Sequence, residues 1–582
     1  MNKRKLSLIA AVGVLAVTAA VYLALDDGGR TAGDQSKQKQ KPDASAQTDP
    51  AASAATANED KAPVIRHVQA NAAQVGLYGK FELQLELEGD FKNPYDPKQI
   101  DLSMELTSPS GKKWQVNGFY DGTAFAWKIR FAPDETGTWI YRVRAVGANQ
   151  GSESSGLEGK FETVQSDHRG WIQLSTDNKR YLEYRDGSDF YGVGIAYPWG
   201  VTDVNLDKIA EHGGNLITYW NGNYDSSGSG GGDDQLQSAT FGVDKIDPLK
   251  AQRIDELVDS FEKRGLHMNF VIWPHDSLAD TLDGWPTAWK KSGYSAIGEA
   301  KDFFTNETMW VHQENLYRYI IARWGYSSAI GIWDLVCEIN GTDGWVHGST
   351  ADTDAWTEKV HDYFKSHDPY GHPTMGSMAG SRQDYWDFGY RTLDIADREN
   401  YYNLSYKSYA TDIRKRWDSY EKPLIIGETG NVTDTLKYHQ AIWVSLANGL
   451  ASSPFWWDFG QVSDEMFMQM KHFASFVATI DFREKRVPVD SGDAGDAQAW
   501  AMQGEKQSYG WLLTEKGSVG GMSVTLPNWP DGAYALTWYD PWTGKTLDGG
   551  RDTPVEIAGG KLELTAPKSS QADLAFTVTR KQ

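Results

Sequence analysis

Cysteine is almost absent from this 582-residue chain, in which Cys337 is the single example. One cysteine excludes an intramolecular disulfide framework. The sequence also lacks His-x-His and Cys-x-x-Cys spacings, which are typical of metal sites. We therefore expect no catalytic metal and no other cofactor.

Positive charge is scarce as well: 57 Lys and Arg residues face 79 Asp and Glu residues, which gives a formal net charge of −22. Few groups would neutralise phosphates, so this balance argues against nucleic acid as a partner. Aromatic residues are plentiful, by contrast, with 24 tryptophans. Aromatic rings fill cores or stack on ligands such as sugars, and a carbohydrate substrate fits this composition.

The N-terminus reads as an export signal. Lys3, Arg4 and Lys5 precede an apolar run at residues 6–25, and small residues at 18–20 would permit cleavage. The run is also long enough to span a bilayer, so a signal peptide and an uncleaved membrane anchor (residues 1–25) both remain open. Either one places the rest of the chain outside the cytoplasm, in the periplasm or beyond the cell.

Residues 26–63 are polar and carry no apolar periodicity, which predicts a disordered linker. Strict alternation then begins at residues 81–87, FELQLEL, and predicts an all-β sandwich over residues 64–165. Lys128 and Arg130 alternate with apolar residues in this region, so we expect them on its solvent-exposed face.

The centre of the chain, residues 166–488, changes to strands alternating with helices. The clearest helix covers residues 248–264, with Asp247 as its N-cap and Gly265 at its end. Eight apolar runs are predicted as strands: residues 190–195, 215–218, 268–273, 330–340, 374–378, 393–396, 423–430 and 454–457. This α/β pattern predicts a (β/α)8 TIM barrel. Alternation returns in residues 489–582, which we interpret as a second β-sandwich.

Two of the apolar runs end in a glutamate. Residues 330–340, IGIWDLVCEIN, carry Glu338, and residues 423–430, PLIIGETG, carry Glu428. A lone glutamate at the end of a strand usually just meets solvent. Two of them, at the C-terminal ends of strands four and seven of a parallel barrel, would share one pocket.

The central region resembles the clan A glycoside hydrolases, which are retaining enzymes. The preceding region, with GFYDG at 118–122 and RFAP at 130–133, resembles an uncharacterised sandwich found before such barrels. The tail, with WYDPWTG at 538–544, resembles a β-domain that commonly follows them. The resemblance implies that Glu338 is the acid/base and Glu428 the nucleophile of a double displacement, with their carboxyl groups about 5–5.5 Å apart.

One position departs from the clan. The clan usually has an asparagine immediately before the acid/base, where it binds the sugar 2-hydroxyl, and here that residue is Cys337. A thiol is a weak hydrogen-bond partner, so Asn340 or Asn221 takes this role or the substrate differs at that carbon. Cys337 as a nucleophile would need an adjacent base, and nearby His347 has no clear orienting partner.

Other residues at strand ends are candidates for binding the substrate. We expect Tyr402 to hold the nucleophile, as a tyrosine does at that place in the clan, and Trp457 to be a sugar platform. Each aromatic among the candidates could equally be core. The complete set of candidates is Tyr197, Trp199, Trp220, Asn221, His275, Asn340, Trp345, Tyr402 and Trp457. The glycine-rich residues 228–232 are either a lid or a tolerated insertion.

The sequence therefore predicts an exported, retaining hydrolase that cleaves β-glycosidic bonds in a polysaccharide or its oligosaccharides. One alternative is a non-catalytic carbohydrate-binding protein that keeps the barrel as a scaffold. Another is a metal-dependent barrel hydrolase or lyase.

Overall fold

The computed structural model describes residues 62–581, apart from residues 90, 123–125, 149–153, 155, 223–234, 284, 380–385, 402, 493–494 and 548–549. The predicted export segment, residues 26–61 of the predicted linker and the glycine-rich segment 228–232 lie outside the described residues. The description below concerns the compact unit Glu59–Gln582. In its described part, no helix has both the length and the apolar character needed to cross a bilayer.

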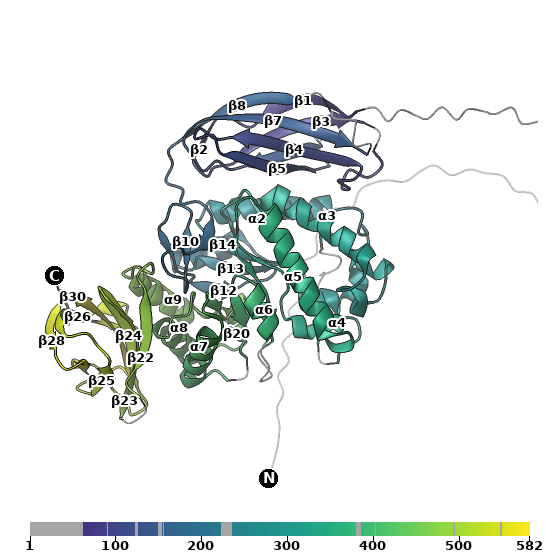
Figure 1. Ribbon diagram of the computed structural model, residues 1–582. Coiled ribbons are helices and arrows are strands. Elements are labelled where there is room, and N and C mark those ends of the chain that lie inside the picture. Colours follow the sequence, from purple (N-terminus) through teal and green to yellow (C-terminus); the bar gives the residue numbers. More distant parts are fainter. Residues whose placement is uncertain are drawn as a thin grey trace, which may run out of the picture. The chain divides into compact units, whose positions relative to one another are not determined.

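An eight-stranded sheet opens the described chain (Figure 1), in the order β1-β3-β6-β5-β4-β7-β8-β2. Its pairings are antiparallel except for β2 with β8. Apolar side chains alternate along the strands and form a core of their own. The strands are β1 (Val64–Ala70), β2 (Gln74–Gly76), β3 (Phe81–Glu88), β4 (Ile100–Thr107), β5 (Lys113–Tyr120), β6 (Trp127–Phe131), β7 (Gly137–Gly147) and β8 (Leu157–Val164).

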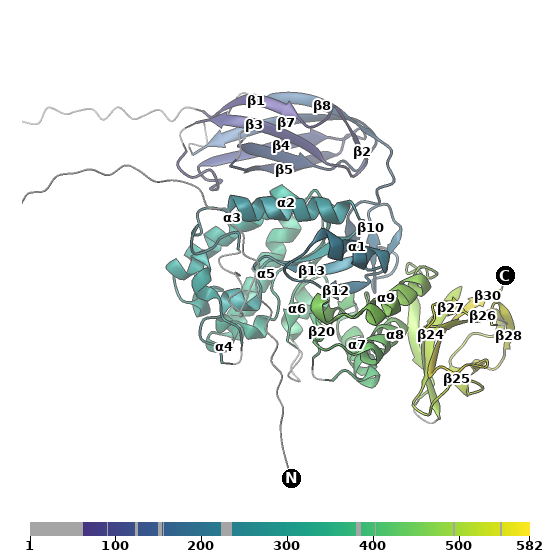
Figure 2. The ribbon, with the colours of Figure 1, turned by 180° about the vertical axis from the view of Figure 1, so that it is seen from behind.

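Arg130, on β6, is not on a solvent-exposed face as the alternation predicted. Helix α3 (Glu307–Trp324) packs against β5 and β6, and Arg130 is buried. Figure 2 shows α3 below β5. The guanidinium of Arg130 donates to Glu82 at 2.8 Å and to Asp255, on α2 (Pro248–Glu262), at 2.8 Å. The side of β6 that carries Arg130 faces helices of the same chain and not solvent. The buried guanidinium therefore needs carboxylate partners.

A mostly parallel set of strands forms the middle of the chain. A small antiparallel sheet, β11-β10-β9, precedes it, and its two parallel sheets have the orders β16-β15-β14-β13-β12-β21-β20 and β17-β18-β19. The order follows the chain, and β21 returns to pair with β12. The strands are β9 (Ile172–Leu174), β10 (Leu182–Tyr184), β11 (Asp189–Phe190), β12 (Gly194–Ala196), β13 (Leu216–Trp220), β14 (His267–Val271), β15 (Ile330–Asp334), β16 (Thr374–Met375), β17 (Ser377–Met378), β18 (Ala396–Arg398), β19 (Leu424–Ile425), β20 (Thr429–Gly430) and β21 (Trp456–Trp457).

Helices alternate with these strands, which gives the mixed α/β class. Helix α2 shows the local reasons well: Asp247 accepts bonds from the N–H groups of Leu249 and Lys250, and Pro248 occupies the first turn. The remaining helices are α1 (Asp203–Glu211), α4 (Asp343–His347), α5 (Thr350–His367), α6 (Asp387–Thr392), α7 (Tyr406–Tyr420), α8 (Thr435–Ala447) and α9 (Asp464–Val477).

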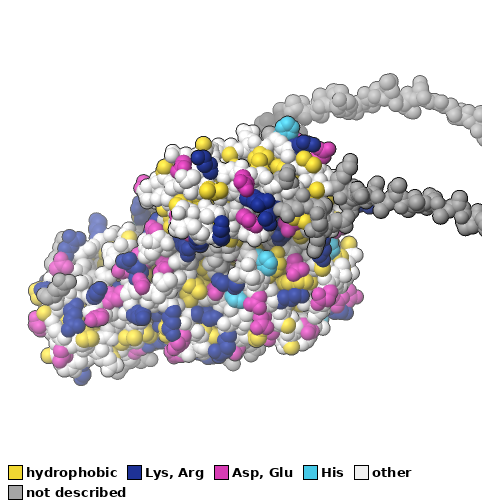
Figure 3. Space-filling view, turned by 45° about the horizontal axis from the view of Figure 1, so that its top comes forward, with side chains coloured by type: hydrophobic (Ala, Val, Ile, Leu, Met, Phe, Trp, Pro, Cys, Tyr) yellow, Lys and Arg dark blue, Asp and Glu magenta, His cyan; other side chains and the backbone are white. Residues whose placement is uncertain are grey.

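The C-terminal region is β again. Its main sheet has the order β22-β23-β24-β30-β26-β27, with β28 beside β26, and β25 pairs with β29. These strands enclose an apolar core that is separate from that of the N-terminal sheet. On the face that Figure 3 shows, acidic and basic side chains are intermixed. The strands are β22 (Arg486–Asp490), β23 (Ala497–Gly504), β24 (Gln507–Thr514), β25 (Ser523–Pro527), β26 (Gly532–Asp540), β27 (Lys545–Thr546), β28 (Thr553–Ile557), β29 (Lys561–Thr565) and β30 (Asp573–Arg580).

Candidate active site

The two predicted catalytic glutamates are both buried at the C-terminal side of the parallel strands. Glu338 follows β15 and adopts the left-handed conformation, with φ 51° and ψ 58°. Its backbone N–H donates to Ser377 Oγ at 2.7 Å, which ties it to β17. Glu428 precedes β20 directly and is 4 % exposed, against 8 % for Glu338.

The thiol of Cys337, the residue before Glu338, lies beside Glu428. Its Sγ lies 3.4 Å from Glu428 Oε1 and 3.6 Å from Oε1 of a third glutamate, Glu399. Burial, followed by the nearby carboxyls of Glu428 and Glu399, raises the pKa of the Cys337 thiol well above its usual range. The thiol therefore stays protonated, which makes it a hydrogen-bond donor and a poor nucleophile.

A tyrosine does hold Glu428. The hydroxyl of Tyr401 donates to Glu428 Oε2 at 2.5 Å. Tyr402, which the sequence analysis preferred for this contact, lies outside the described residues. Burial and then the charge of Glu338 raise the pKa of Glu428 well above its usual range, while the bonds from Tyr401 and Cys337 oppose the rise.

Glu399 is a functional candidate that the sequence analysis missed. The sixth strand was predicted at residues 393–396, but β18 covers Ala396–Arg398, so Glu399 is the residue that directly follows it. Its side chain is buried, and its Oε1 accepts a bond from Ser377 Oγ at 2.6 Å. An acid at the end of an apolar run was the signal that found Glu338 and Glu428. Here Asp397 and Arg398 made the run look polar.

Three predicted sugar-binding tryptophans form one cluster. The ring centroids of Trp199, Trp220 and Trp457 lie 5.5–5.6 Å apart, and the rings pack around Cys337. His275 joins this cluster through an edge contact with Trp220. Its Nδ1 lies 3.3 Å from Glu338 Oε2, so an imidazole borders the predicted acid/base.

The other candidates are more varied. Asn221 is buried beside the tryptophans, and its Oδ1 has no hydrogen-bond partner among the described residues. Asn340 is engaged, because its Oδ1 accepts from the Ala379 N–H at 2.8 Å. Tyr197 binds the Gly200 carbonyl and stacks on Phe459, and Trp345 meets Trp386. These contacts of Tyr197 and Trp345 pack the fold together.

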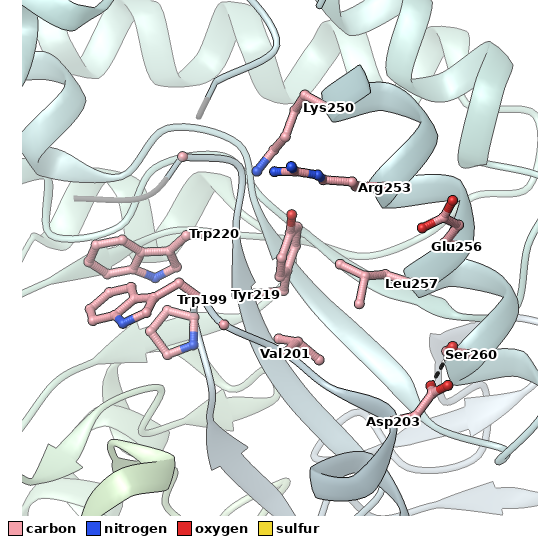
Figure 4. A pocket seen from close by; sticks show the side chains of 13 residues that line it. Trp199, Val201, Asp203, Tyr219, Trp220, Lys250, Arg253, Glu256, Leu257 and Ser260 are labelled. Carbon is pink, nitrogen blue, oxygen red and sulfur yellow. Dashed lines mark hydrogen bonds between the residues drawn. The ribbon is translucent and has the colours of Figure 1, made fainter. Parts of the chain in front are cut away.

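A cleft of about 480 Å³ opens beside the tryptophan cluster. Figure 4 shows the rings of Trp199 and Trp220 side by side on one side of it, while Lys250 and Arg253 extend from α2 on the other. Indole faces with nearby polar groups are suited to a sugar chain.

One group of side chains in the described part of the chain could also hold a metal. Ligand atoms of Cys337, Glu399 and Glu428 all lie within 4.8 Å of one another. In the structure these side chains are joined by hydrogen bonds from the Cys337 thiol to Glu428 Oε1 and Glu399 Oε1. The group is better understood as a hydrogen-bonded cluster of acids.

Comparisons with known proteins support the same fold. A provisionally assigned glycoside hydrolase from Bacteroides vulgatus superposes with a TM-score of 0.60 at 17% identity, over 88% of this chain and all of that one. This chain shares its fold. An endo-1,4-β-mannanase from Rhizomucor miehei matches with a TM-score of 0.41 at 15% identity, over 53% of this chain and all of that one.

A family 39 glycoside hydrolase from Bacteroides cellulosilyticus matches with a TM-score of 0.39 at 12% identity, over 88% of this chain and all of that one. Among families, residues 74–146 match the domain of unknown function DUF5060. The search of curated proteins finds no match. The likeness to the Bacteroides vulgatus protein, at 17% identity, shows a glycoside hydrolase fold and does not identify the reaction.

Proposed function

We propose that this protein is a retaining glycoside hydrolase of clan A that cleaves β-glycosidic bonds in a polysaccharide or its oligosaccharides. In this proposal the parallel strands close into a (β/α)8 barrel over residues 166–488. Residues 64–165 and 489–582 are β-sandwiches. The glycoside hydrolase fold of the Bacteroides vulgatus protein supports the barrel, as does the parallel bridge between Asn400 and Thr429, which joins the ends of the sixth and seventh strands.

One observation carries the proposal. Glu338 and Glu428 are 90 residues apart in the chain, yet both are buried and the charge of Glu338 raises the pKa of Glu428. Burying carboxyl groups together is unfavourable, because each charge raises the cost of the other. Such an arrangement is typical of a site where two carboxyls do different work.

The surroundings suggest how the two roles divide. Glu428 accepts from Tyr401 and Cys337, and both bonds favour the charged form that a nucleophile requires, against the rise in pKa that burial and Glu338 cause. Its carboxylate attacks the anomeric carbon and forms an ester while the bond to the leaving oxygen breaks. Glu338 gives its proton to that oxygen, then removes a proton from water, which attacks the same carbon and releases Glu428.

We also propose that the chain acts outside the cytoplasm, because of the apolar run at residues 6–25. The tryptophan cluster and the cleft beside it would bind successive sugar units. The alternative roles, a non-catalytic carbohydrate-binding protein and a metal-dependent hydrolase or lyase, predict different outcomes in the experiment below.

The test is to incubate the purified protein with activated 2-deoxy-2-fluoro-β-glycosides of several sugars and to measure its intact mass, followed by peptide mapping. We expect one glycosyl adduct on Glu428, which is absent from Glu428→Gln and unaffected by a chelator. An adduct on another residue would overturn the assigned roles.

A panel of β-glycans complements this test with natural linkages. We expect hydrolysis of at least one of them, with retention of anomeric configuration followed by NMR. Binding without cleavage, unchanged in Glu338→Gln and Glu428→Gln, would favour the scaffold role. Loss of cleavage in chelator would favour the metal-dependent one.

A further inference from the structure

Glu399 is a third carboxyl in the site, and the double displacement gives it no role. It is 1 % exposed and directly follows β18, the sixth strand of the parallel set. A buried carboxyl without a cation beside it is costly. The charged groups that act on Glu399 most strongly are themselves acids: Glu338, Glu428 and Asp397.

The two oxygens of Glu399 have different surroundings. Oε1 accepts the Ser377 hydroxyl at 2.6 Å, and Ser377 in turn accepts the backbone N–H of Glu338 at 2.7 Å. Oε2 is buried and accepts no hydrogen bond from a donor among the described residues, while a side-chain hydrogen bond with Glu338 favours the protonated form of Glu399. A neutral carboxylic acid fits this pattern, with Oε1 as its acceptor and Oε2–H as its donor toward the neighbouring carboxylate.

The thiol of Cys337 cannot replace this donor. The single S–H of Cys337 lies closer to Glu428 Oε1, at 3.4 Å, than to Glu399 Oε1, at 3.6 Å. It is also a weak donor at the position where the clan has an amide. A stronger neutral donor next to Cys337 would compensate for the missing amide.

We propose that Glu399 is a positioning residue that stays protonated: through Ser377 its Oε1 holds the backbone of Glu338, and its Oε2–H donates to whichever catalytic carboxylate carries the charge. This inference rests on the proposed function. During the first displacement the negative charge leaves Glu428 and appears on Glu338, and a donor near both stabilises each state. Burial, and then Glu338 and Glu428, raise the pKa of Glu399 well above its usual range, which keeps the proton in place.

The experiment compares infrared difference spectra and pH–rate profiles of the full chain and four variants. Glu399→Gln keeps the size and a neutral donor, and Glu399→Ala removes both. Ser377→Ala keeps Glu399 but removes the donor to its Oε1, together with the acceptor of the Glu338 N–H. The control is Glu183→Gln. Glu183 lies on β10 of the small antiparallel sheet, outside the candidate site, and it is also a buried carboxyl that accepts hydrogen bonds from hydroxyl groups, those of Ser175 and Thr176.

In the infrared we expect a protonated-carboxyl band at neutral pH that disappears in Glu399→Gln and persists in the control. In Ser377→Ala the band should move to higher frequency, because its C=O loses a hydrogen bond. Absence of a band attributable to Glu399 would overturn the inference. This readout needs no turnover, so it separates failure of this inference from failure of the proposed function, which the labelling of Glu428 decides.

In the kinetics we expect Glu399→Gln to lower kcat by less than about ten-fold and Glu399→Ala by more than about 100-fold. Both limbs of the pH profile should stay within about 0.3 pH unit of wild type in Glu399→Gln, because a neutral group replaces a neutral group. A shift of both limbs to lower pH by about one unit would mean that Glu399 is ionised, and would overturn the inference. If Glu399→Gln fails to fold, the band shift in Ser377→Ala decides alone.

Discussion

Two groups of buried charges in this molecule are built in opposite ways. Between the N-terminal sheet and helices α2 and α3, each charge meets its opposite: Asp255 bonds the guanidinium of Arg130 at 2.8 Å and that of Arg323 at 2.6 Å. These arginines hold the pKa of Asp255 well below its usual range against burial. In the candidate site, carboxyls have carboxyls as neighbours, and the pKa values of Glu399 and Glu428 rise instead.

We infer from this difference that the paired charges stabilise the fold and that the like charges serve function. Paired opposite charges are costly to break and lock two parts of the fold together. Unpaired like charges destabilise the folded state, and proteins retain them where their altered proton affinity is useful. The predictions below test each group by neutralising it.

Neutralising Glu428 should have the largest effect, and it should separate activity from stability. We expect Glu428→Gln to lower kcat by at least about 10⁴-fold, because the nucleophile is lost. The free energy of unfolding should rise by about 1 kcal/mol, because one buried like charge disappears. Hydrolysis of an aryl glycoside and urea unfolding measure the two quantities. Loss of both would mean that Glu428 is structural.

Neutralising Asp255 should lower stability and leave activity unchanged. Asp255→Asn leaves two buried guanidiniums short of their partner, so we expect the free energy of unfolding to fall by about 3–5 kcal/mol. Activity per folded molecule should remain. The matched control on the same helix is Asp259→Asn, whose exposed bridge to Lys80 contributes at most about 1 kcal/mol. Equal losses of unfolding free energy in Asp255→Asn and Asp259→Asn would mean that the buried ion pairs stabilise the fold no more than an exposed one, which would contradict the comparison.

Removing the hydroxyl of Tyr401 sharpens the picture of Glu428. Because its hydrogen bond favours the carboxylate, Tyr401→Phe should raise the pKa of Glu428 and move the acid limb of the pH–rate profile to higher pH. We expect kcat to fall about 10–100-fold. Tyr409→Phe, which loses a bond to Thr429 next to Glu428, is the control and should leave the acid limb in place. An unmoved limb in Tyr401→Phe would contradict the assignment.

Asp334, on β15, extends the comparison to the pH dependence of stability. Burial and the neighbouring Asp397 raise its pKa to about 8, compared with about 3.9 in an unfolded chain. A raised pKa means that the favourable contribution is complete at low pH and is lost between about pH 4 and 8. We expect Asp334→Asn to lose less stability than wild type over this range in urea unfolding. Parallel curves of unfolding free energy against pH for wild type and Asp334→Asn would refute this prediction.

Much of the fold could be predicted from the sequence. Alternation located strands in both terminal β-regions, and the run that carries Glu428 contains β19 and β20. The run at residues 330–340 contains β15, but this strand ends at Asp334, four residues before Glu338, so it is shorter than predicted. The capped helix at residue 248 was also predicted correctly, because its N-cap and proline are local signals. Closure of the barrel, the β-sandwich interpretation and the domain boundaries stay predictions.

The candidate site was less predictable. Arg130 was placed on the solvent-exposed face because alternation shows which residues share a side of a strand and cannot show what covers that side. Glu399 escaped because the polar residues Asp397 and Arg398 hid the end of the sixth strand, whose position depends on pairing with β17 and β19.

The sequence by itself determined the local elements and two acids at strand ends, because hydrophobic periodicity, caps and turns act over a few residues. The tertiary structure alone decided which groups meet: that Tyr401 bonds Glu428, that His275 borders Glu338, and that Glu399 joins them through Ser377. These contacts join strands far apart in the chain. Their burial sets the proton affinities of the acids, because desolvation and neighbouring charge exist only once the strands have assembled.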